Sequence, residues 1–103
     1  MKFKLWLEFE LWERDQKWNP YNDFFNMQID LEDGNKYALN VWTFEYFDSA
    51  VKEIEIVGDN LNGKYLEPPD LFIKKLDRKL CENVVSDLIK NNALKKEWLI
   101  IED

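Results

Sequence analysis

The chain has 103 residues, of which 46% are hydrophobic and 16% aromatic, so it can bury a core and does not have the composition of a disordered protein. Its 21 acidic and 14 basic residues give a net charge of −7, which disfavours direct binding to nucleic acid or to an anionic membrane. The size fits one domain over residues 1–103, and the lack of a signal-peptide pattern or a long apolar run favours the cytoplasm.

Alternation of apolar and polar residues predicts three strands, at about 2–12, 24–32 and 36–43. The turn residues Asp33-Gly34-Asn35 predict that the last two strands form a hairpin. For their apolar rows to share a face, we expect paired positions that sum to 68. This register makes 33–35 the loop and sets Glu32 opposite Lys36.

The hydrophobic period changes after residue 43, where Phe44, Phe47 and Val51 step by three or four and predict a helix at about 44–56. Residues 54–56 fit an extended chain equally well. Residues 65–73 contain two consecutive prolines, which are typical of an irregular or edge segment. A second helix is predicted at about 77–91, with Asp77 as its N-cap, and a short apolar segment at 98–101 is expected to dock as an edge strand.

These elements predict an α+β fold in which an antiparallel sheet of three or more strands is packed on one face by two helices. The charged residues are unevenly distributed along the sequence. Residues 1–73 have a net charge of −8, whereas residues 74–96 have a net charge of +4.

The residue types argue against most catalytic sites. The chain has no histidine, so it cannot assemble a Ser-His-Asp or Cys-His arrangement, and its single cysteine, Cys81, falls on the apolar stripe of a predicted helix. The segments 59–63 and 30–34 do not match a calcium loop, and no glycine-rich phosphate loop is present. We therefore expect no catalytic, cofactor-binding or metal-binding residues and no enzymatic activity, although a pair of carboxylates remains an alternative.

A binding surface is the better-supported expectation. If helices cover the apolar side of the sheet, the other side presents aromatic and acidic side chains, a combination suited to a basic protein partner. The alternative is that the connection 13–22 covers Trp6 and Trp42 with Trp18 and Tyr21. The candidate partner-binding residues are Trp6, Glu8, Glu10, Trp12, Asp30, Glu32 and Trp42.

Two stretches, YALNVWT at 37–43 and NGKYLEPPDLFI at 62–73, together with the helix that follows to about residue 92, resemble small bacterial proteins of the toxin–immunity kind. The resemblance implies a cytoplasmic inhibitor that binds and neutralises a cognate toxin domain. The alternatives are a structural or assembly protein that associates through an exposed strand edge, and a carboxylate-based enzyme or small-ligand binder. The sequence does not determine the oligomeric state.

Overall fold

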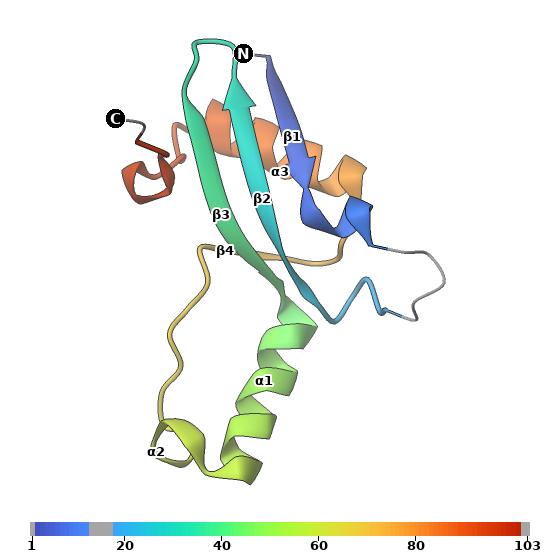
Figure 1. Ribbon diagram of the computed structural model, residues 1–103, viewed down its shortest axis with the longest axis vertical. Helices are drawn as coiled ribbons and strands as arrows, with labels where there is room; N and C mark the ends of the chain where they lie inside the picture. The colour runs from blue at the N-terminus through green and yellow to red at the C-terminus, as the bar shows by residue number, and fades with distance from the viewer. Residues whose placement is uncertain (1, 13–17, 102–103) are drawn as a thin grey trace.

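The computed structural model describes residues 2–12 and 18–101, which form a four-stranded sheet in the order β1-β2-β3-β4 together with helices (Figure 1). β1 (Phe3–Leu7), β2 (Phe24–Leu31) and β3 (Lys36–Thr43) are antiparallel neighbours, and β4 (Leu71–Ile73) runs parallel to β3. The helices are α1 (Phe44–Val57), α2 (Asp59–Gly63) and α3 (Arg78–Lys90). The predicted α+β class and its mainly antiparallel sheet are therefore confirmed.

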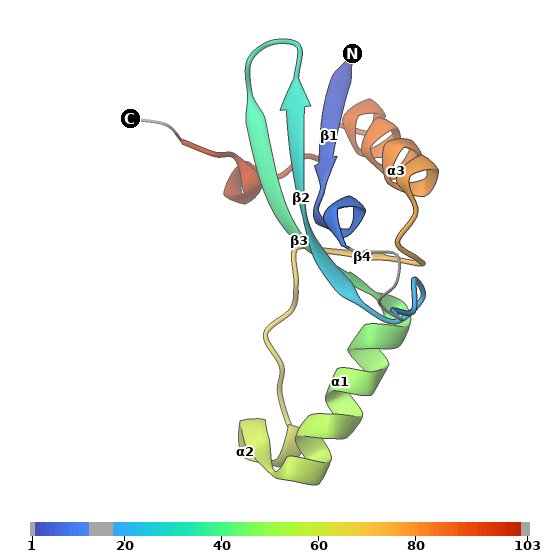
Figure 2. The same cartoon turned by 45° about the vertical axis from the view of Figure 1, so that its right-hand side comes forward.

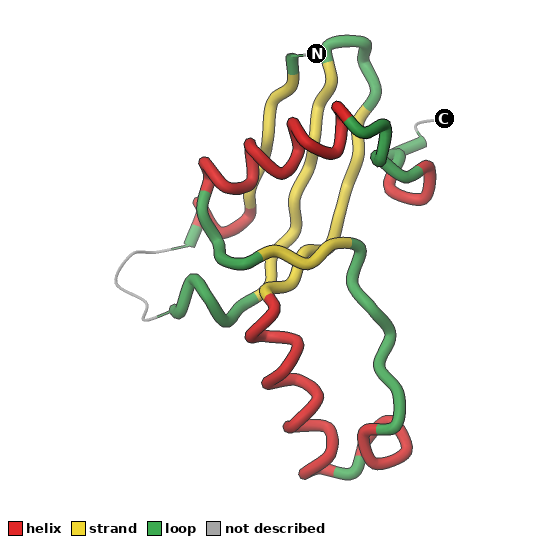
Figure 3. The backbone as a smooth tube through the Cα atoms, turned by 180° about the vertical axis from the view of Figure 1, so that it is seen from behind, coloured by secondary structure: helices red, strands yellow, loops and turns green. Residues whose placement is uncertain are grey.

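The core lies between α3 and one face of the sheet. Seen from behind, α3 crosses the three long strands (Figure 3). Cys81 and Val85 of the helix are completely buried, and Asp77 caps its first turn by accepting a hydrogen bond from the backbone N–H of Leu80 at 2.8 Å. The inward side chains of the strands alternate with outward polar ones, as the pattern predicts. The largest completely or almost completely buried side chains of the sheet are Leu7, Phe25, Met27, Ile29 and Val41.

The first strand is shorter than the predicted range 2–12. It ends at Leu7, and residues Glu8–Leu11 form a 3-10 helix that still buries Phe9 against Phe25, with ring centroids 4.9 Å apart. The Glu8 carboxylate accepts hydrogen bonds from the backbone N–H of Asn26 at 2.9 Å and from its side-chain amide at 3.3 Å. The Glu8 side chain thus supplies the hydrogen-bond acceptor for β2 that the backbone of a longer β1 would have supplied.

The β2–β3 hairpin has a different register from the predicted one, because its paired positions sum to 66 and set Asp30 opposite Lys36. The Leu31 N–H donates to the Asn35 carbonyl at 2.9 Å, which makes residues 32–34 the three-residue loop. Gly34 closes that loop with φ 94°, a left-handed conformation that favours glycine at this last position. The predicted parity holds because the shift is of two residues, so the apolar rows still share a face.

The placement of α1 also differs from the prediction, which put the helix at 44–56 on the sheet face. α1 begins directly at the end of β3, buries no residue and points away from the sheet (Figures 1 and 2). Thr43 sets this exit, since its completely buried hydroxyl accepts from the N–H of Tyr46 at 3.1 Å and from the N–H of Asp23 at 3.2 Å. One side chain therefore caps the helix and ties it to the start of β2.

The chain reverses at the far end of α1 through a left-handed turn. Gly58 and Gly63 have φ values of 82° and 79°, and Asn60, Leu61 and Asn62 between them also have positive φ. Gly63 lies so close to α1 that an added Cβ would come within 2.4 Å of the Glu55 side chain. We call α1, α2 and the returning segment, residues 44–70, the arm.

The outer edge of β3 is occupied at both ends. β4 pairs with Val41–Thr43, and the Asp70 carboxylate accepts from the Asn40 N–H at 2.7 Å. The predicted C-terminal strand 98–101 is reduced to one bridge between Leu99 and Tyr37, with a hydrogen bond from the Ile100 N–H to the Lys36 carbonyl at 2.8 Å. Among the described residues, no helix is long and apolar enough to cross a bilayer.

The Thr43 hydroxyl gives a first prediction. Replacing Thr43 by Val keeps the shape but leaves the Asp23 and Tyr46 N–H groups without their acceptor, so it should lower the free energy of unfolding by about 1–3 kcal/mol. Urea denaturation measures the loss, and hydrogen exchange should show faster exchange at the Tyr46 amide. Thr43→Ser retains the hydroxyl and should keep that amide protected; equal exchange rates in the two variants would contradict the assignment.

Candidate functional site

Within residues 2–12 and 18–101, no α-helix covers the sheet face opposite α3, as the turned view shows (Figure 2). We call it the open face. Its rows follow from the strand register: Lys4, Asp30 and Lys36 form one row, and Trp6, Gln28 and Ala38 form the next. Asn26 pairs with Asn40 in the third row, and the fourth row runs across three strands through Phe24, Trp42 and Phe72. Trp6 is 46% exposed, so its ring is available to a partner.

The seven predicted binding residues do not form one surface. Trp6, Glu8, Asp30 and Trp42 lie on the open face or at its border, and Glu32 is in the hairpin loop. Trp12 leaves this face with the 3-10 turn and packs edge-on against Trp18, with centroids 5.3 Å apart. Trp18 therefore covers Trp12, and the sequence alternative in which it covers Trp6 and Trp42 is not what the structure shows; residues 13–17 of that connection lie outside the described residues.

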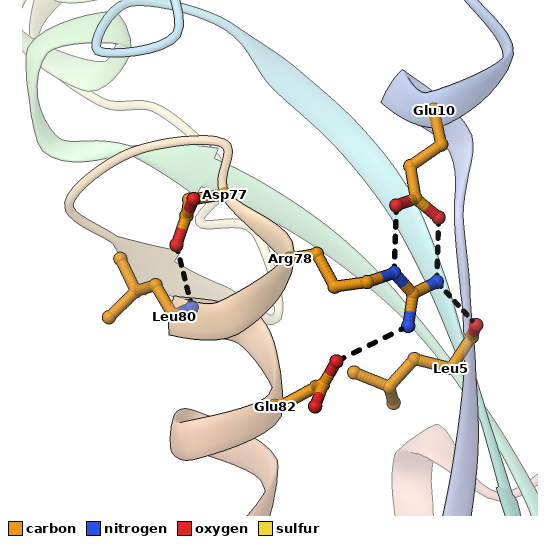
Figure 4. Close-up of polar contacts among 6 residues, drawn as sticks. All are labelled: Leu5, Glu10, Asp77, Arg78, Leu80 and Glu82. Carbon is orange, nitrogen blue, oxygen red and sulfur yellow. Dashed lines mark hydrogen bonds and ion pairs between the residues drawn. The ribbon is translucent and has the colours of Figure 1, made fainter.

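Glu10 turns toward α3 and forms an ion pair with Arg78 (Figure 4). The Arg78 Nε and Nη2 atoms donate to the two carboxylate oxygens at 2.7 and 2.6 Å, and Nη2 also donates to the Leu5 carbonyl at 3.0 Å. The hydrogen bonds from Arg78 hold the pKa of Glu10 below its ordinary value of 4.5, against the opposing effect of burial. The contact joins the 3-10 helix, the β1 edge and the first turn of α3, so Glu10 has a structural partner within the chain.

The open face ends in an aromatic cluster where β3 passes into α1. Tyr46 of α1 contacts Phe24 and Trp42 with centroids 5.0 and 5.1 Å apart. Phe72 of β4 stacks on Phe44 at 6.0 Å and meets Phe47 edge-on at 5.3 Å. We call these six residues, Phe24, Trp42, Phe44, Tyr46, Phe47 and Phe72, the aromatic cluster.

The aromatic cluster is incompletely covered. Phe24, Phe44 and Phe47 are 42%, 59% and 39% exposed, an unusual concentration of aromatic surface. Only Trp42 was among the predicted site residues. The density of aromatic residues between 42 and 47 is a sequence signal for Phe44, Tyr46 and Phe47. Phe24 and Phe72 join the cluster from distant parts of the chain, so no local pattern indicates them.

The acidic charge is not on the open face. The charged residues of its strand rows and border are Lys4, Lys36, Asp30 and Glu8, which balance. By contrast, the arm carries seven acidic residues and two lysines, a net charge of −5 out of −7 for the chain. Burial, and then the negative charges of Asp23 and Glu53, raise the pKa of Tyr46 above its ordinary value, so these two acids lie near the aromatic cluster.

The surface hollows are shallow and lie away from this cluster. One of about 510 Å³ lies between the start of β1 and the end of β2, with Asp30 and Glu32 among its lining residues. In the part of the chain that the structure describes, no three His, Cys, Asp or Glu residues come together as a metal site. The features of this surface that a ligand or partner could contact are thus the aromatic cluster and the negative charge of the arm.

Comparisons with protein-family models, with curated proteins and with solved structures found no match.

The Glu10–Arg78 pair gives a prediction on pH. Its side chains are 39% and 42% exposed, so solvent screens the interaction and Glu10→Gln should cost about 1 kcal/mol of unfolding free energy at pH 7. Because the pKa of Glu10 is lowered in the folded chain, its contribution is complete above the unfolded-state pKa and is lost as the pH falls through the folded value. Urea denaturation should show that the difference in unfolding free energy between Glu10→Gln and the unchanged chain becomes smaller below pH 4.5.

Glu82→Gln is the matched control, since its carboxylate lies 3.6 Å from Arg78 and should matter less. If Glu10→Gln lowers the unfolding free energy by the same amount at pH 7 and at pH 3, the negative charge of Glu10 does not stabilise the fold.

Cys81 gives a second prediction here. Burial raises the pKa of its thiol to about 12, so the reactive thiolate is scarce at neutral pH. A thiol-reactive dye should label the native protein much more slowly than the urea-unfolded protein. Labelling of both forms at the same rate would show that the packing of α3 on the sheet does not shield the sulfur.

Proposed function

We propose that this chain is a small acidic protein-binding module of the immunity type, which neutralises a cognate bacterial toxin by covering a basic surface of it in the cytoplasm. The observation that carries the proposal is the half-exposed aromatic cluster beside the acidic arm. Exposed aromatic side chains supply most of the binding energy at protein interfaces, and charge of one sign steers an oppositely charged partner. The resemblance of residues 37–43 and 62–73 to immunity-type proteins suggests which kind of partner is bound.

The predicted site residues contribute unequally to this proposal. Trp42 belongs to the aromatic cluster, and Trp6 is exposed on the adjoining sheet. Glu8 and Glu10 are engaged with Asn26 and Arg78, so they hold the fold while remaining part of the negative surface. We accordingly place the centre of binding at the aromatic cluster and not at the first strand.

The alternative of assembly through a strand edge has less support. The outer edge of β3 is paired with β4 and with the C-terminal segment, and the Leu5 carbonyl on the β1 edge accepts from Arg78. The alternative of a carboxylate enzyme would need two carboxylates facing each other in a deep pocket. The hollow that holds Asp30 and Glu32 is open, and Asp30 accepts a hydrogen bond from Gln28 at 3.1 Å.

The test is binding to a basic toxin domain. The gene should neighbour one that encodes a large secreted protein with a basic C-terminal domain, and calorimetry should show a stoichiometric complex with that domain. Phe44→Ala, which removes a largely exposed ring, should weaken binding by about tenfold, and raising the salt from 50 to 300 mM should weaken it further. A domain that retains full toxicity with excess of this chain, and shows no heat of binding, would refute the proposal.

A further inference from the structure

The arm contains a helix that does not pack on the sheet, and the short α2, whose Gly63 lies against Glu55, is its neighbour at the far end. α1 has 14 residues, yet none of them is buried. An isolated helix of this length is only marginally stable in water, and most helices in proteins are stabilised by packing of an apolar face. The cap at Thr43 and the contacts of Phe44 and Phe47 with Phe72 hold its first turn to the sheet. In the second turn, the Asn22 side-chain amide donates a hydrogen bond to the Ser49 hydroxyl at 2.9 Å.

The helix nevertheless has a well-defined apolar face. With 3.6 residues per turn, Phe47, Val51 and Ile54 fall on one side, and Ala50 and Val57 widen the stripe. Phe47 and Val57 at its two ends are 39% and 59% exposed, and Ala50, Val51 and Ile54 between them are partly buried. The stripe is thus continuous with the aromatic cluster and extends it along the arm.

Acidic residues border this stripe on both sides. Asp48 and Glu55, seven residues apart, lie along one border, and Glu53 lies along the other. Lys52 is the only basic residue of α1, and it pairs with Asp48 at 2.9 Å on the exposed surface. The stripe is therefore an apolar surface framed by negative charge.

The negative charge of the arm indicates which kind of partner can bind the stripe. Two arms of this chain, each with a net charge of −5, would repel each other if their stripes packed together, so a second copy is a poor match. We propose that α1 is the recognition helix of this chain, and that its apolar stripe lies in a hydrophobic groove of a partner protein whose rims carry Lys and Arg. This inference rests on the proposed function, because it locates the surface by which the chain would bind a basic toxin domain.

The chain offers a matched pair of variants for the test. Ile54 and Ile56 are two residues apart in the same helix, but Ile54 lies on the stripe whereas Ile56 lies on the opposite face and is 84% exposed. Alanine is a better helix former than isoleucine, so neither substitution should unfold α1, and circular dichroism can verify this. Any difference in binding between the two variants then reports the face that the partner contacts.

The experiment is calorimetry with the same basic domain as above. Ile54→Ala should weaken binding by about tenfold, whereas Ile56→Ala and the open-face variant Trp6→Ala should change it by less than about twofold. The double variant Asp48→Asn with Glu53→Gln should bind more weakly at low salt and show a smaller salt dependence.

Each outcome has a distinct meaning. Equal losses for Ile54→Ala and Ile56→Ala, or a loss for Trp6→Ala alone, would overturn the assignment to the stripe while leaving the inhibitor function intact. An absence of binding by the unchanged chain would overturn both. Formation of a dimer by the free chain that Ile54→Ala abolishes would show that a second copy occupies the stripe, and would also overturn the inference.

Discussion

The fold depends on burying one face of the sheet under a single helix. Cys81 and Val85 of α3, completely excluded from solvent, sit over side chains such as Met27 and Ile29 that project inward from the strands. Apolar burial is the main favourable term in folding, and here it is concentrated in this one layer. The N-cap at Asp77 and the Arg78–Glu10 pair fix where α3 starts and how it meets β1, so the layer has a defined orientation. The arm leaves this two-layer unit at the end of β3.

Sequence patterns predicted where most regular elements lie better than they predicted how those elements pair and pack. The strand at 36–43, and α3 with its Asp77 cap, match the prediction to within a residue, because each buries a regular row of side chains. The hairpin register was wrong by two residues and its loop by one, since parity cannot distinguish registers that differ by two. The positive φ of Gly34, which suits the last loop position, does distinguish them. Alternation also continued past Leu7 into a 3-10 turn, because Phe9 reaches the core from either backbone conformation.

The position of α1 could not be predicted from its own sequence. Its amphipathic pattern is typical of a helix packed on a sheet, and a pattern specifies an apolar face without specifying what covers it. Thr43 determines the direction in which α1 leaves the sheet, because its hydroxyl accepts hydrogen bonds both from the first turn of the helix and from Asp23, just before β2. The bond to Asp23 is a long-range contact, which a local periodicity in the sequence cannot reveal. The same limit applies to the candidate site, where Phe72 joins the aromatic cluster from a strand that follows the arm. The amphipathic helix projects from the core within an arm whose net charge is −5, and this combination is the reason for proposing an external partner.

The Arg78 guanidinium has a consequence for the behaviour of the protein in concentrated solution. β1 is the outermost strand, and a strand in that position offers unpaired carbonyl groups that a neighbouring molecule can use to extend the sheet. Arg78 fills one such position at Leu5 with a side chain that is charged and cannot continue a ladder. Protection from edge-to-edge aggregation is therefore supplied by an arginine from a distant helix, held in place by Glu10. Acidification that neutralises this glutamate weakens the blockade as well as the core, and so links colloidal stability to the same proton.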